Sequence, residues 1–432
     1  MEGCALGPRL GPDVTFGTEA ANAVTREPCE TRRMQWPEGF LWGTGASSTQ
    51  CEGAAPASDW WAWERSGHAP LSGDGNGFAT RYAEDFGLLA GLGLTHHRLS
   101  LEWARLEPEH GRHDAGAVAH YRDVLTSARA AGISPWVCLH HFTLPRWFLD
   151  AGGFTVAPNR TDHWARHVAF VADTFGDLVD GWQPVNETNY YARAAYGGRG
   201  WPPGHDDRRE AALVHEAMHL TAAEAAVRLR QTGAPVASIF GLSPIVPQDD
   251  DPATSALARR LYEYYWEPGI GLFRDGVLRV PGRPPLDRPD LAGSFDLFGF
   301  SYYAAMGVRD GRLAIHPPGA PVSPLVYGIW ADGVGLVLDR LHAELPDTPL
   351  LVAEYGIGTH DDRDRVAYLE RGLVVVNDAI ARGIDVRGLF HWTAVDNYEW
   401  LHGYDMAFGI IDADRTVRAS ARVLQREACA QP

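Results

Sequence analysis

The stretch Leu350-Leu351-Val352-Ala353-Glu354 runs four apolar residues without a break into a glutamate. A short apolar run with no polar alternation is typical of a strand that is buried on both faces, as strands of parallel sheets are. A carboxylate at the end of such a run is costly to bury unless a site uses it or an ion pair neutralises it. The stretch therefore predicts a parallel-sheet strand over residues 349–354 with a functional glutamate at its carboxyl end.

Other apolar runs of the same kind lie on both sides of this one. They cover residues 40–48, 95–102, 134–141, 181–186, 236–243, 296–303 and 386–393. Helical patterns lie between them, at 79–90, 115–131, 161–175, 208–230 and 363–382. Strands that alternate with helices in this way predict an α/β fold with a closed parallel sheet, a (β/α)8 TIM barrel built as a single domain.

A doubly wound open sheet is the alternative fold. It normally carries a glycine-rich phosphate loop after its first strand. The corresponding segment here, Trp42-Gly43-Thr44-Gly45-Ala46, lacks the rest of that fingerprint. The barrel is therefore favoured.

The first 33 residues differ in composition from the rest of the chain. They are rich in Gly, Pro, Ala, Thr and Arg and show no hydrophobic period. This predicts a disordered N-terminal extension over residues 1–33, or a start codon placed too early, followed by the barrel over residues 34–432.

The net charge and the cysteine content of the chain limit which partners and which cellular location can be expected. The 38 Lys and Arg residues against 55 Asp and Glu give a net charge of −17, which disfavours nucleic acid and anionic membranes as partners. No apolar stretch approaches the length of a membrane span. The cysteines number five, an odd and widely spaced set, and no apolar leader precedes the body, so a cytoplasmic location is expected. Oligomeric state leaves no mark in the sequence.

Polar side chains stand at the carboxyl ends of several predicted strands. Arg98 lies in the second strand, His141 ends the third, and Asn186 and Glu187 follow the fourth. In a barrel these ends converge on one mouth, which holds the active site. We therefore expect Glu187 to meet Glu354 there, although a purely structural ion pair with Arg98 is the alternative for Glu354.

Two carboxyl groups on well-separated strands suit the hydrolysis of a glycosidic bond. One protonates the leaving oxygen, and the other attacks the sugar or activates water. Burial and mutual repulsion would raise the pKa of the acid, and a neighbouring arginine would keep the nucleophile ionised. The pair thus predicts glycosidase chemistry.

The motifs around these residues resemble glycoside hydrolase family 1, the β-glucosidase family, from about residue 35 to residue 420. They are Gln50-Cys51-Glu52-Gly53, Arg98-Leu99-Ser100-Leu101-Glu102-Trp103, Leu139-His140-His141-Phe142-Thr143-Leu144-Pro145, Asn186-Glu187-Thr188, Tyr302-Tyr303, Glu354-Tyr355-Gly356 and Asp396-Asn397-Tyr398-Glu399-Trp400-Leu401-His402-Gly403-Tyr404. Each motif alone is weak, but their order along the chain makes the resemblance specific.

The resemblance implies a retaining β-glycosidase with Glu187 as general acid/base and Glu354 as nucleophile. It also implies that Asn186 binds the sugar 2-hydroxyl and that Arg98 and Tyr302 hold Glu354. The nonreducing sugar would be bound by Gln50, His141, Trp392, Glu399 and Trp400. No cofactor is implied, and no histidine pair has metal spacing with a matching carboxylate, so no metal is expected.

Several residues beside the site depart from the family pattern. Thr188 replaces a proline, Ser301 an asparagine and Tyr355 another asparagine, so the pocket shape and the aglycone preference are open. Asp405 would repel a sugar 6-phosphate, so the expected partner is a small unphosphorylated β-glycoside. Gln50 and Glu399 can hydrogen-bond the hydroxyls of glucose, galactose or fucose, so the sequence does not distinguish these sugars.

Three functions compete. The first is hydrolysis of a β-glucoside or a close epimer. The second is a transglycosidase, or a tailoring glycosidase that acts on a specialised-metabolite glycoside, which the altered residues beside the site motivate. The third is a catalytically weak carbohydrate-binding relative, against which the retention of both glutamates speaks.

Overall fold

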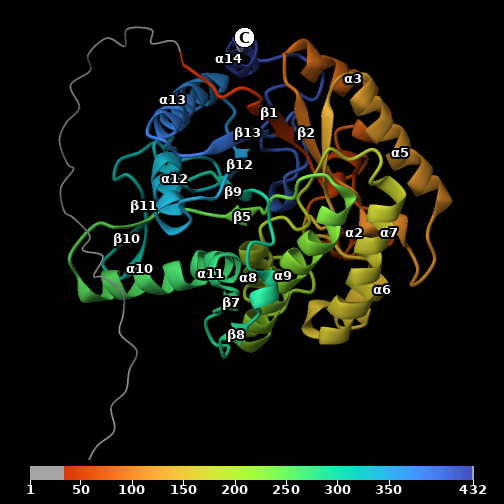
Figure 1. The fold of residues 1–432 in the computed structure, drawn as a ribbon, viewed down its shortest axis with the longest axis horizontal. Coiled ribbons are helices and arrows are strands. Elements are labelled where there is room, and N and C mark those ends of the chain that lie inside the picture. Colours follow the sequence, from red (N-terminus) through yellow and green to blue (C-terminus); the bar gives the residue numbers. More distant parts are fainter. Residues whose placement is uncertain (1–33, 431–432) are drawn as a thin grey trace, which may run out of the picture. The chain divides into compact units, whose positions relative to one another are not determined.

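The computed structural model describes residues 34–430, and its centre is an eight-stranded parallel sheet (Figure 1). The strand order is β4-β3-β2-β1-β13-β12-β9-β5. The strands are β1 (Leu41–Gly45), β2 (His96–Ser100), β3 (Ser134–Cys138), β4 (Gly181–Trp182), β5 (Phe240–Gly241), β9 (Phe298–Tyr302), β12 (Leu350–Tyr355) and β13 (Val386–Trp392). Each predicted apolar run contains one of these strands.

The two edges of this sheet meet and close it into a barrel. Trp182 at the end of β4 forms a parallel bridge with Val236, just before β5. The Trp182 amide donates to the carbonyl of Pro235 at 2.9 Å, and its carbonyl accepts from the Ala237 amide at 2.8 Å. The predicted TIM barrel is confirmed, and an open doubly wound sheet is excluded.

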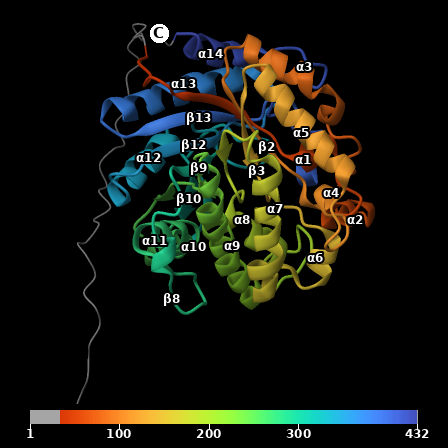
Figure 2. The same ribbon diagram turned by 45° about the vertical axis from the view of Figure 1, so that its right-hand side comes forward.

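Helices surround the strands, with α3 and α5 on one side and α12 and α13 on the other (Figure 2). The helices are α1 (Ser48–Glu52), α2 (Asp59–Arg65), α3 (Phe78–Gly91), α4 (Trp103–Leu106), α5 (Ala115–Ala130), α6 (Arg146–Asp150), α7 (Ala165–Phe175), α8 (Thr188–Tyr196), α9 (Arg208–Leu229), α10 (Pro252–Tyr265), α11 (Glu267–Asp275), α12 (Gly333–Glu344), α13 (Asp362–Ala381) and α14 (Ala419–Ala428). Every predicted helical stretch is found. The segment predicted from residue 161 begins as a π-helix, Asn159–Trp164, before α7.

Two small sheets lie in the longer connections. One has the order β11-β10-β6, with β6 (Ile245–Pro247), β10 (Met306–Arg309) and β11 (Arg312–Ile315). The other is the hairpin of β7 (Val277–Leu278) and β8 (Leu286–Asp287). The first sheet builds up the connections after β5 and β9 on the side of the barrel mouth.

The barrel interior is filled by side chains of the strands and of the residues that lead into them, as expected for this fold. The buried cluster there consists of Trp136, Ala237, Ile239, Leu297, Leu351, Ala353 and Phe390. Two glycines make room for its rings. A Cβ on Gly43 would lie 2.5 Å from the Phe390 ring, and one on Gly181 would lie 2.2 Å from the Trp136 ring.

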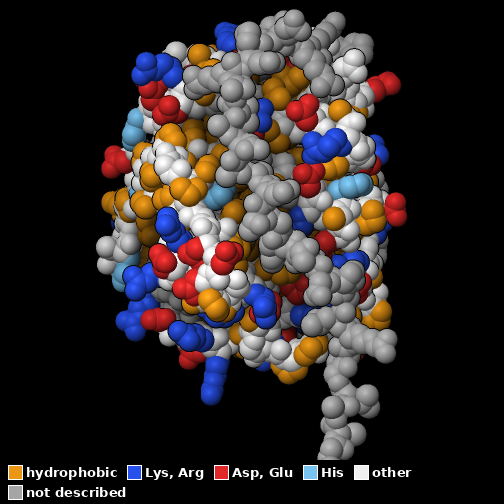
Figure 3. All heavy atoms as spheres, turned by 90° about the vertical axis from the view of Figure 1, so that its left-hand side faces the viewer, with side chains coloured by type: hydrophobic (Ala, Val, Ile, Leu, Met, Phe, Trp, Pro, Cys, Tyr) orange, Lys and Arg blue, Asp and Glu red, His pale blue; other side chains and the backbone are white. Residues whose placement is uncertain are grey.

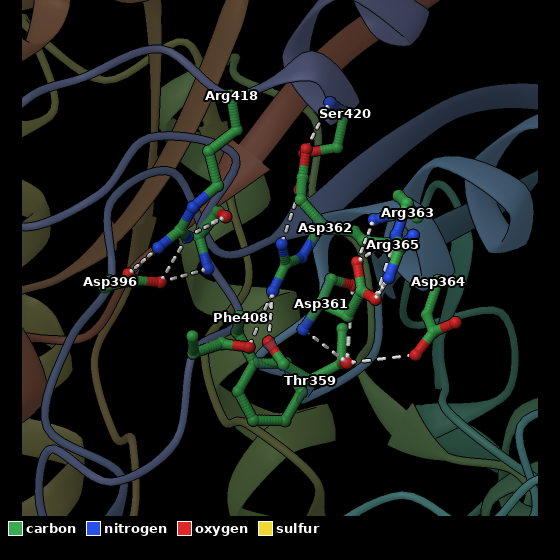
Figure 4. Close-up of polar contacts among 12 residues, drawn as sticks. Thr359, Asp361, Asp362, Arg363, Asp364, Arg365, Asp396, Phe408, Arg418 and Ser420 are labelled. Atoms are coloured by element: carbon green, nitrogen blue, oxygen red, sulfur yellow. Dashed lines mark hydrogen bonds and ion pairs between the residues drawn. The ribbon is translucent and has the colours of Figure 1, made fainter.

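An ionic network holds the segment after β13 against the C-terminal part of the chain (Figure 4). Arg418 donates to the Asp396 carboxylate at 2.8 Å and to the Gly409 carbonyl at 2.6 Å. Arg365 donates to the Asp362 carboxylate at 2.6 Å and to the Ala407 carbonyl at 2.8 Å. The network fixes both ends of the connection that carries the predicted sugar-binding residues of the last motif.

The surface of the described part mixes charges of both signs. On the face drawn in Figure 3, acidic and basic side chains are interspersed among hydrophobic ones. No helix within residues 34–430 is long and apolar enough to cross a membrane. Three cysteines of this part, Cys51, Cys138 and Cys429, are free thiols. The predicted extension over residues 1–33 lies outside the described residues.

Candidate active site

A cavity of about 460 Å³ opens at the carboxyl ends of the barrel strands. Most of the predicted site residues line it, and they come from five different strands or the connections that follow them. They are Gln50, His141, Asn186, Glu187, Glu354, Trp392, Glu399 and Trp400. The sequence therefore located the cavity correctly. Arg98 lies beneath its floor, fully buried, and Tyr302 does not line it.

Glu354 is held from two sides at the end of β12. One carboxylate oxygen forms an ion pair with Arg98, and the other accepts from the hydroxyl of Tyr303 at 2.5 Å. The expected contact with Arg98 is therefore present. Because Glu354 also faces the cavity, a purely structural ion pair does not describe its position.

The expected contact between Tyr302 and Glu354 is wrong. The Tyr302 hydroxyl donates instead to the Trp330 carbonyl at 2.5 Å, on the side where α12 covers the barrel. Successive side chains of a strand point to opposite faces, so Tyr302 points outward when its neighbours Ser301 and Tyr303 point inward. The period of two along β9 was the signal that identifies Tyr303.

Arg98 also fixes the state of His141. Its guanidinium donates to Nδ1 of His141 at 3.0 Å, so that nitrogen is an acceptor and the proton of the neutral ring lies on Nε2. Burial first, and then the charge of Arg98, lower the pKa of His141 well below its usual value. His141 therefore offers a neutral N–H donor at the cavity.

Glu187 occupies the first position before α8, with a left-handed backbone (φ 43°). Its carboxylate accepts from the hydroxyl of Ser301, and it lies so close to Gly241 that a Cβ there would be 3.2 Å from Oε1. Burial first, and then the negative charge of Glu354, raise the pKa of Glu187 to about 7. At neutral pH this carboxyl group is thus able both to give and to take a proton.

Ser301 connects the two carboxyl groups. Its backbone pairs with Glu354 in the ladder between β9 and β12, and its side chain bonds Glu187. A single short residue therefore separates a carboxylate on β12 from a carboxyl group at the start of α8. This arrangement explains why the charge of one raises the pKa of the other.

The deep end of the cavity combines polar groups with flat rings. Gln50 donates to the Glu399 carboxylate at 3.1 Å, and Ser47 donates to the Gln50 carbonyl oxygen at 2.8 Å. Burial, and then the charge of Glu354, raise the pKa of Glu399 to about 8. The rings of Trp392 and Trp400 both lie nearly parallel to that of His141, at interplanar angles of 9° and 11°. Hydrogen-bonding groups beside flat apolar faces match a sugar.

The outer half of the cavity was not predicted. It is formed by residues of α8 and the segment that follows it, of the connections after β5, β9 and β13, and of the segment around Tyr327. These residues are Tyr190, Arg193, Trp201, Leu242, Ser243, Tyr265, Ala304, Ala305, Met306, Leu325, Tyr327, Leu401, His402 and Phe408. They lie beyond the strand ends, and strand patterns therefore gave no signal for them. Within residues 34–430, no three His, Cys, Asp or Glu side chains are grouped so that they could hold a metal ion.

Two carboxyl groups at the mouth of a (β/α)8 barrel, one of them ion-paired with an arginine, suit the cleavage of a glycosidic bond. Residues 32–429 match glycosyl hydrolase family 1. The chain therefore belongs to this family of retaining O-glycosyl hydrolases, and the predicted family, fold and enzyme class are confirmed.

Individual relatives are similar along most of their length. Thermostable beta-glucosidase B of Thermobispora bispora is 30% identical over 421 residues, which cover 89% of this chain and 87% of that protein. Cyanidin 3-O-glucoside 5-O-glucosyltransferase (acyl-glucose) of Dianthus caryophyllus is 27% identical over 442 residues, 89% of this chain and 85% of that protein. The structure of a beta-glycosidase from Pyrococcus horikoshii superimposes with a TM-score of 0.85 at 29% identity, over 92% of this chain and 95% of the other.

Proposed function

We propose that the enzyme hydrolyses an unphosphorylated β-glucoside, or a close epimer, by double displacement, with Glu354 as nucleophile and Glu187 as general acid/base. The observation that carries the proposal is the asymmetry of the two carboxyl groups. Glu354 is ion-paired with Arg98, whereas Glu187 has no arginine partner and a pKa of about 7. The similarity to a beta-glucosidase of Thermobispora bispora supports the glucoside.

In the first step Glu187 transfers its proton to the glycosidic oxygen while Glu354 attacks the anomeric carbon. The bond to the aglycone breaks, and an ester between the sugar and Glu354 forms. This ester carries no negative charge, so one of the influences that raise the pKa of Glu187 disappears. Glu187 is then ionised more readily and becomes the base of the second step.

In the second step water loses a proton to Glu187 and its oxygen attacks the anomeric carbon from the face that the aglycone left. Glu354 leaves as a carboxylate and again pairs with Arg98. Tyr303 donates to the same carboxylate and holds its orientation. The product keeps the β configuration because the sugar is inverted twice.

The remaining polar groups are assigned to the sugar. Asn186 accepts from Arg98 at 3.5 Å, which leaves its amide donors for the 2-hydroxyl. His141, Gln50 and Glu399 supply donors and acceptors for the other hydroxyls, and Trp392 supplies a flat apolar face. Among residues 34–430, no arginine or lysine lines the deep end of the cavity where it could bind a sugar phosphate, which supports an unphosphorylated substrate.

Transglycosylation is a second candidate, because the relative from Dianthus caryophyllus is named a glucosyltransferase. An alcohol would then replace water in the second step, with the same two glutamates. The distribution of product between free sugar and a new glycoside, in the presence of an alcohol acceptor, separates the two. A cytoplasmic location is part of the proposal, supported by the free thiols Cys51, Cys138 and Cys429.

Azide rescue of two variants tests the roles directly. In Glu354→Gly the nucleophile is missing, so azide should attack the sugar from the vacated side and give the α-glycosyl azide. In Glu187→Ala an activated aryl glucoside should still form the ester, and azide should release the β-glycosyl azide.

The matched control is Glu107→Gln. Glu107 is buried and accepts from Trp103 and Gly111, but it does not line the cavity. It should keep turnover without azide. The same azide stereochemistry from both variants, or substantial activity in Glu354→Gly, would overturn the assignment.

A further inference from the structure

The outer half of the cavity suits a flat aglycone. The ring centroid of Trp201 lies 5.0 Å from that of Trp400 and 5.7 Å from that of Tyr190. Leu242, Met306 and Leu325 add apolar surface around these rings. An aromatic group that leaves the sugar toward solvent would be bordered by rings and aliphatic side chains.

Arg193 is the exception in this apolar wall. It is the only arginine or lysine that lines the cavity in the described part of the chain. Its Nη1 donates to the hydroxyl of Tyr265 at 2.6 Å. Arg193 is exposed, and no carboxylate within residues 34–430 forms an ion pair with it, so its remaining donors are accessible from solvent.

The distribution of charged side chains in the cavity indicates what Arg193 could bind. Glu187, Glu354 and Glu399 line the deep end, and the arginine beneath it, Arg98, is already bound to Glu354. A carboxylate on the aglycone would find no unpaired cation there, so a cation at the outer end would have to bind it. Arg193 is placed to supply that cation, and its planar donors match a carboxylate in a bidentate geometry.

The spacing along α8 suits one aromatic ring. Glu187 precedes the helix and Arg193 lies in its last turn, six positions further on, which corresponds to roughly 9 Å along the helix axis. Tyr190 lies between them, and the charges of both act on its phenol. A ring that carries both the glycosidic oxygen and an acidic group would lie along Tyr190, and its hydrogen bonds to Glu187 and Arg193 would cover the rest of this distance.

We propose that Arg193 binds a carboxylate on the aglycone, so that the preferred substrates are β-glycosides of phenolic acids. This inference rests on the proposed glycosidase function and names the class of its aglycone. The arginine orients the departing phenol with its oxygen at Glu187 and its carboxylate at the cavity mouth.

A matched pair of substrates tests it. The 3-carboxyphenyl β-glucoside and its methyl ester have the same ring and similar leaving groups, but only the first is charged. The wild-type enzyme should show a kcat/KM at least about tenfold higher for the acid, as expected for a hydrogen-bonded charge pair. Arg193→Gln should remove this preference, through a KM that rises for the acid much more than for the ester.

Two further variants separate recognition from structure. Arg199→Gln is the control, because Arg199 is exposed, lies near Asp206 and does not line the cavity, and it should keep the preference for the acid. Tyr265→Phe removes the protein partner of Arg193 but keeps the guanidinium, and it should also keep the preference.

The outcomes are distinguishable. If neither glucoside is cleaved, the proposed function fails. If the wild-type enzyme cleaves both equally, or if Arg193→Gln lowers both equally, the inference is overturned and the glycosidase function stands. Should Arg193→Gln not fold, inhibition of the wild-type enzyme by 3-hydroxybenzoate and by its methyl ester decides instead, and equal inhibition constants would contradict the inference.

Discussion

At the scale of single residues, the working state of Glu187 depends on a few opposing contacts. Burial and the charge of Glu354 favour its protonated form, whereas the hydroxyl of Ser301 and the charge of Arg98 favour its carboxylate. The resulting pKa of about 7 suits a group that must act first as an acid and then as a base. The hydrogen bond from Ser301 is the one of these influences that a mutation can remove while both glutamates and Arg98 are kept.

Ser301→Ala should raise the pKa of Glu187, because a donor that stabilises the carboxylate is lost. The acid form then persists to higher pH, and the basic limb of the kcat/KM profile should move upward by up to about one pH unit. Ser301→Thr, which keeps the hydroxyl, should restore the wild-type limb.

Ser238→Ala is the matched control for this profile. Ser238 is another buried serine of the barrel, but its hydroxyl bonds the backbone of Gly299 and no carboxylate. The basic limb of the kcat/KM profile of Ser238→Ala should coincide with that of the wild-type enzyme. An unchanged limb in Ser301→Ala would show that this hydroxyl does not tune Glu187.

Tyr302, which ends β9, and Tyr303, which follows it, make a matched pair for mutation. Tyr303→Phe removes the donor to Glu354 and should lower kcat roughly 100-fold, the usual scale for losing one buried donor at a reacting oxygen. Tyr302→Phe removes the bond to Trp330 and should cost about 1 kcal/mol of unfolding free energy with little change in kcat. Equal kcat values for the two variants would contradict this assignment.

At the scale of elements, the sequence predicted the parts of the site that strands position. The eight apolar runs located β1 to β13 of the barrel, and the polar residues at their ends located Glu187, Glu354 and Arg98. The sheet of β6, β10 and β11 was missed because connections follow no fixed hydrophobic period. Arg193 was missed because it lies on α8, beyond the strand ends that the sequence marked. Tyr302 was chosen over Tyr303 because a motif gives the order of residues but not the face of the strand.

The connection after β13 is joined to β1 by the hydrogen bond from the Ala394 amide to the Gly45 carbonyl, and the ionic network of Figure 4 holds it further along. Asp396 begins this connection and is held by Arg418, and both side chains are about four-fifths buried. Glu399 and Trp400 follow within a few residues. The network therefore positions two predicted sugar-binding side chains from outside the cavity.

Arg418→Met should leave Asp396 without its partner and destabilise the fold by roughly 3 kcal/mol, as expected when one half of a buried pair is removed. Because the connection loosens, KM for a glucoside should rise more than kcat falls. Arg387→Met is the control, since Arg387 and Asp385 form an exposed pair at the other end of β13, and it should cost less than about 1 kcal/mol. A normal KM in Arg418→Met would show that the ionic network does not contribute to sugar binding.

At the scale of the whole molecule, the barrel brings residues far apart in sequence to one cavity. Gln50 and Glu399 are 349 positions apart, and they are joined by a hydrogen bond because β1 and β13 are neighbours in the closed sheet. The bridge between Trp182 and Val236 closes the sheet and so fixes the circumference of the barrel. The site therefore requires the complete ring of strands, from β1 to β13.

The N-terminal limit of the folded barrel is marked by the first residues that contact it. The carbonyl of Gln35 accepts from Asn377 at 2.6 Å, and the indole of Trp36 donates to Glu427 at 3.3 Å and packs against Phe40 and Trp42. The contacts that seat β1 between β2 and β13 thus begin at residue 35.

A chain shortened to residues 34–432 should therefore fold with an unchanged midpoint of thermal unfolding and hydrolyse an aryl β-glucoside at the rate of the full chain. A chain that begins at residue 47 is the matched control. It lacks β1, which leaves the edges of β2 and β13 unpaired and removes the strand that precedes Gln50, so it should not fold. Loss of solubility or turnover in the chain that begins at residue 34 would show that residues 1–33 contribute to the folded enzyme, and the domain boundary would have to move toward the N-terminus.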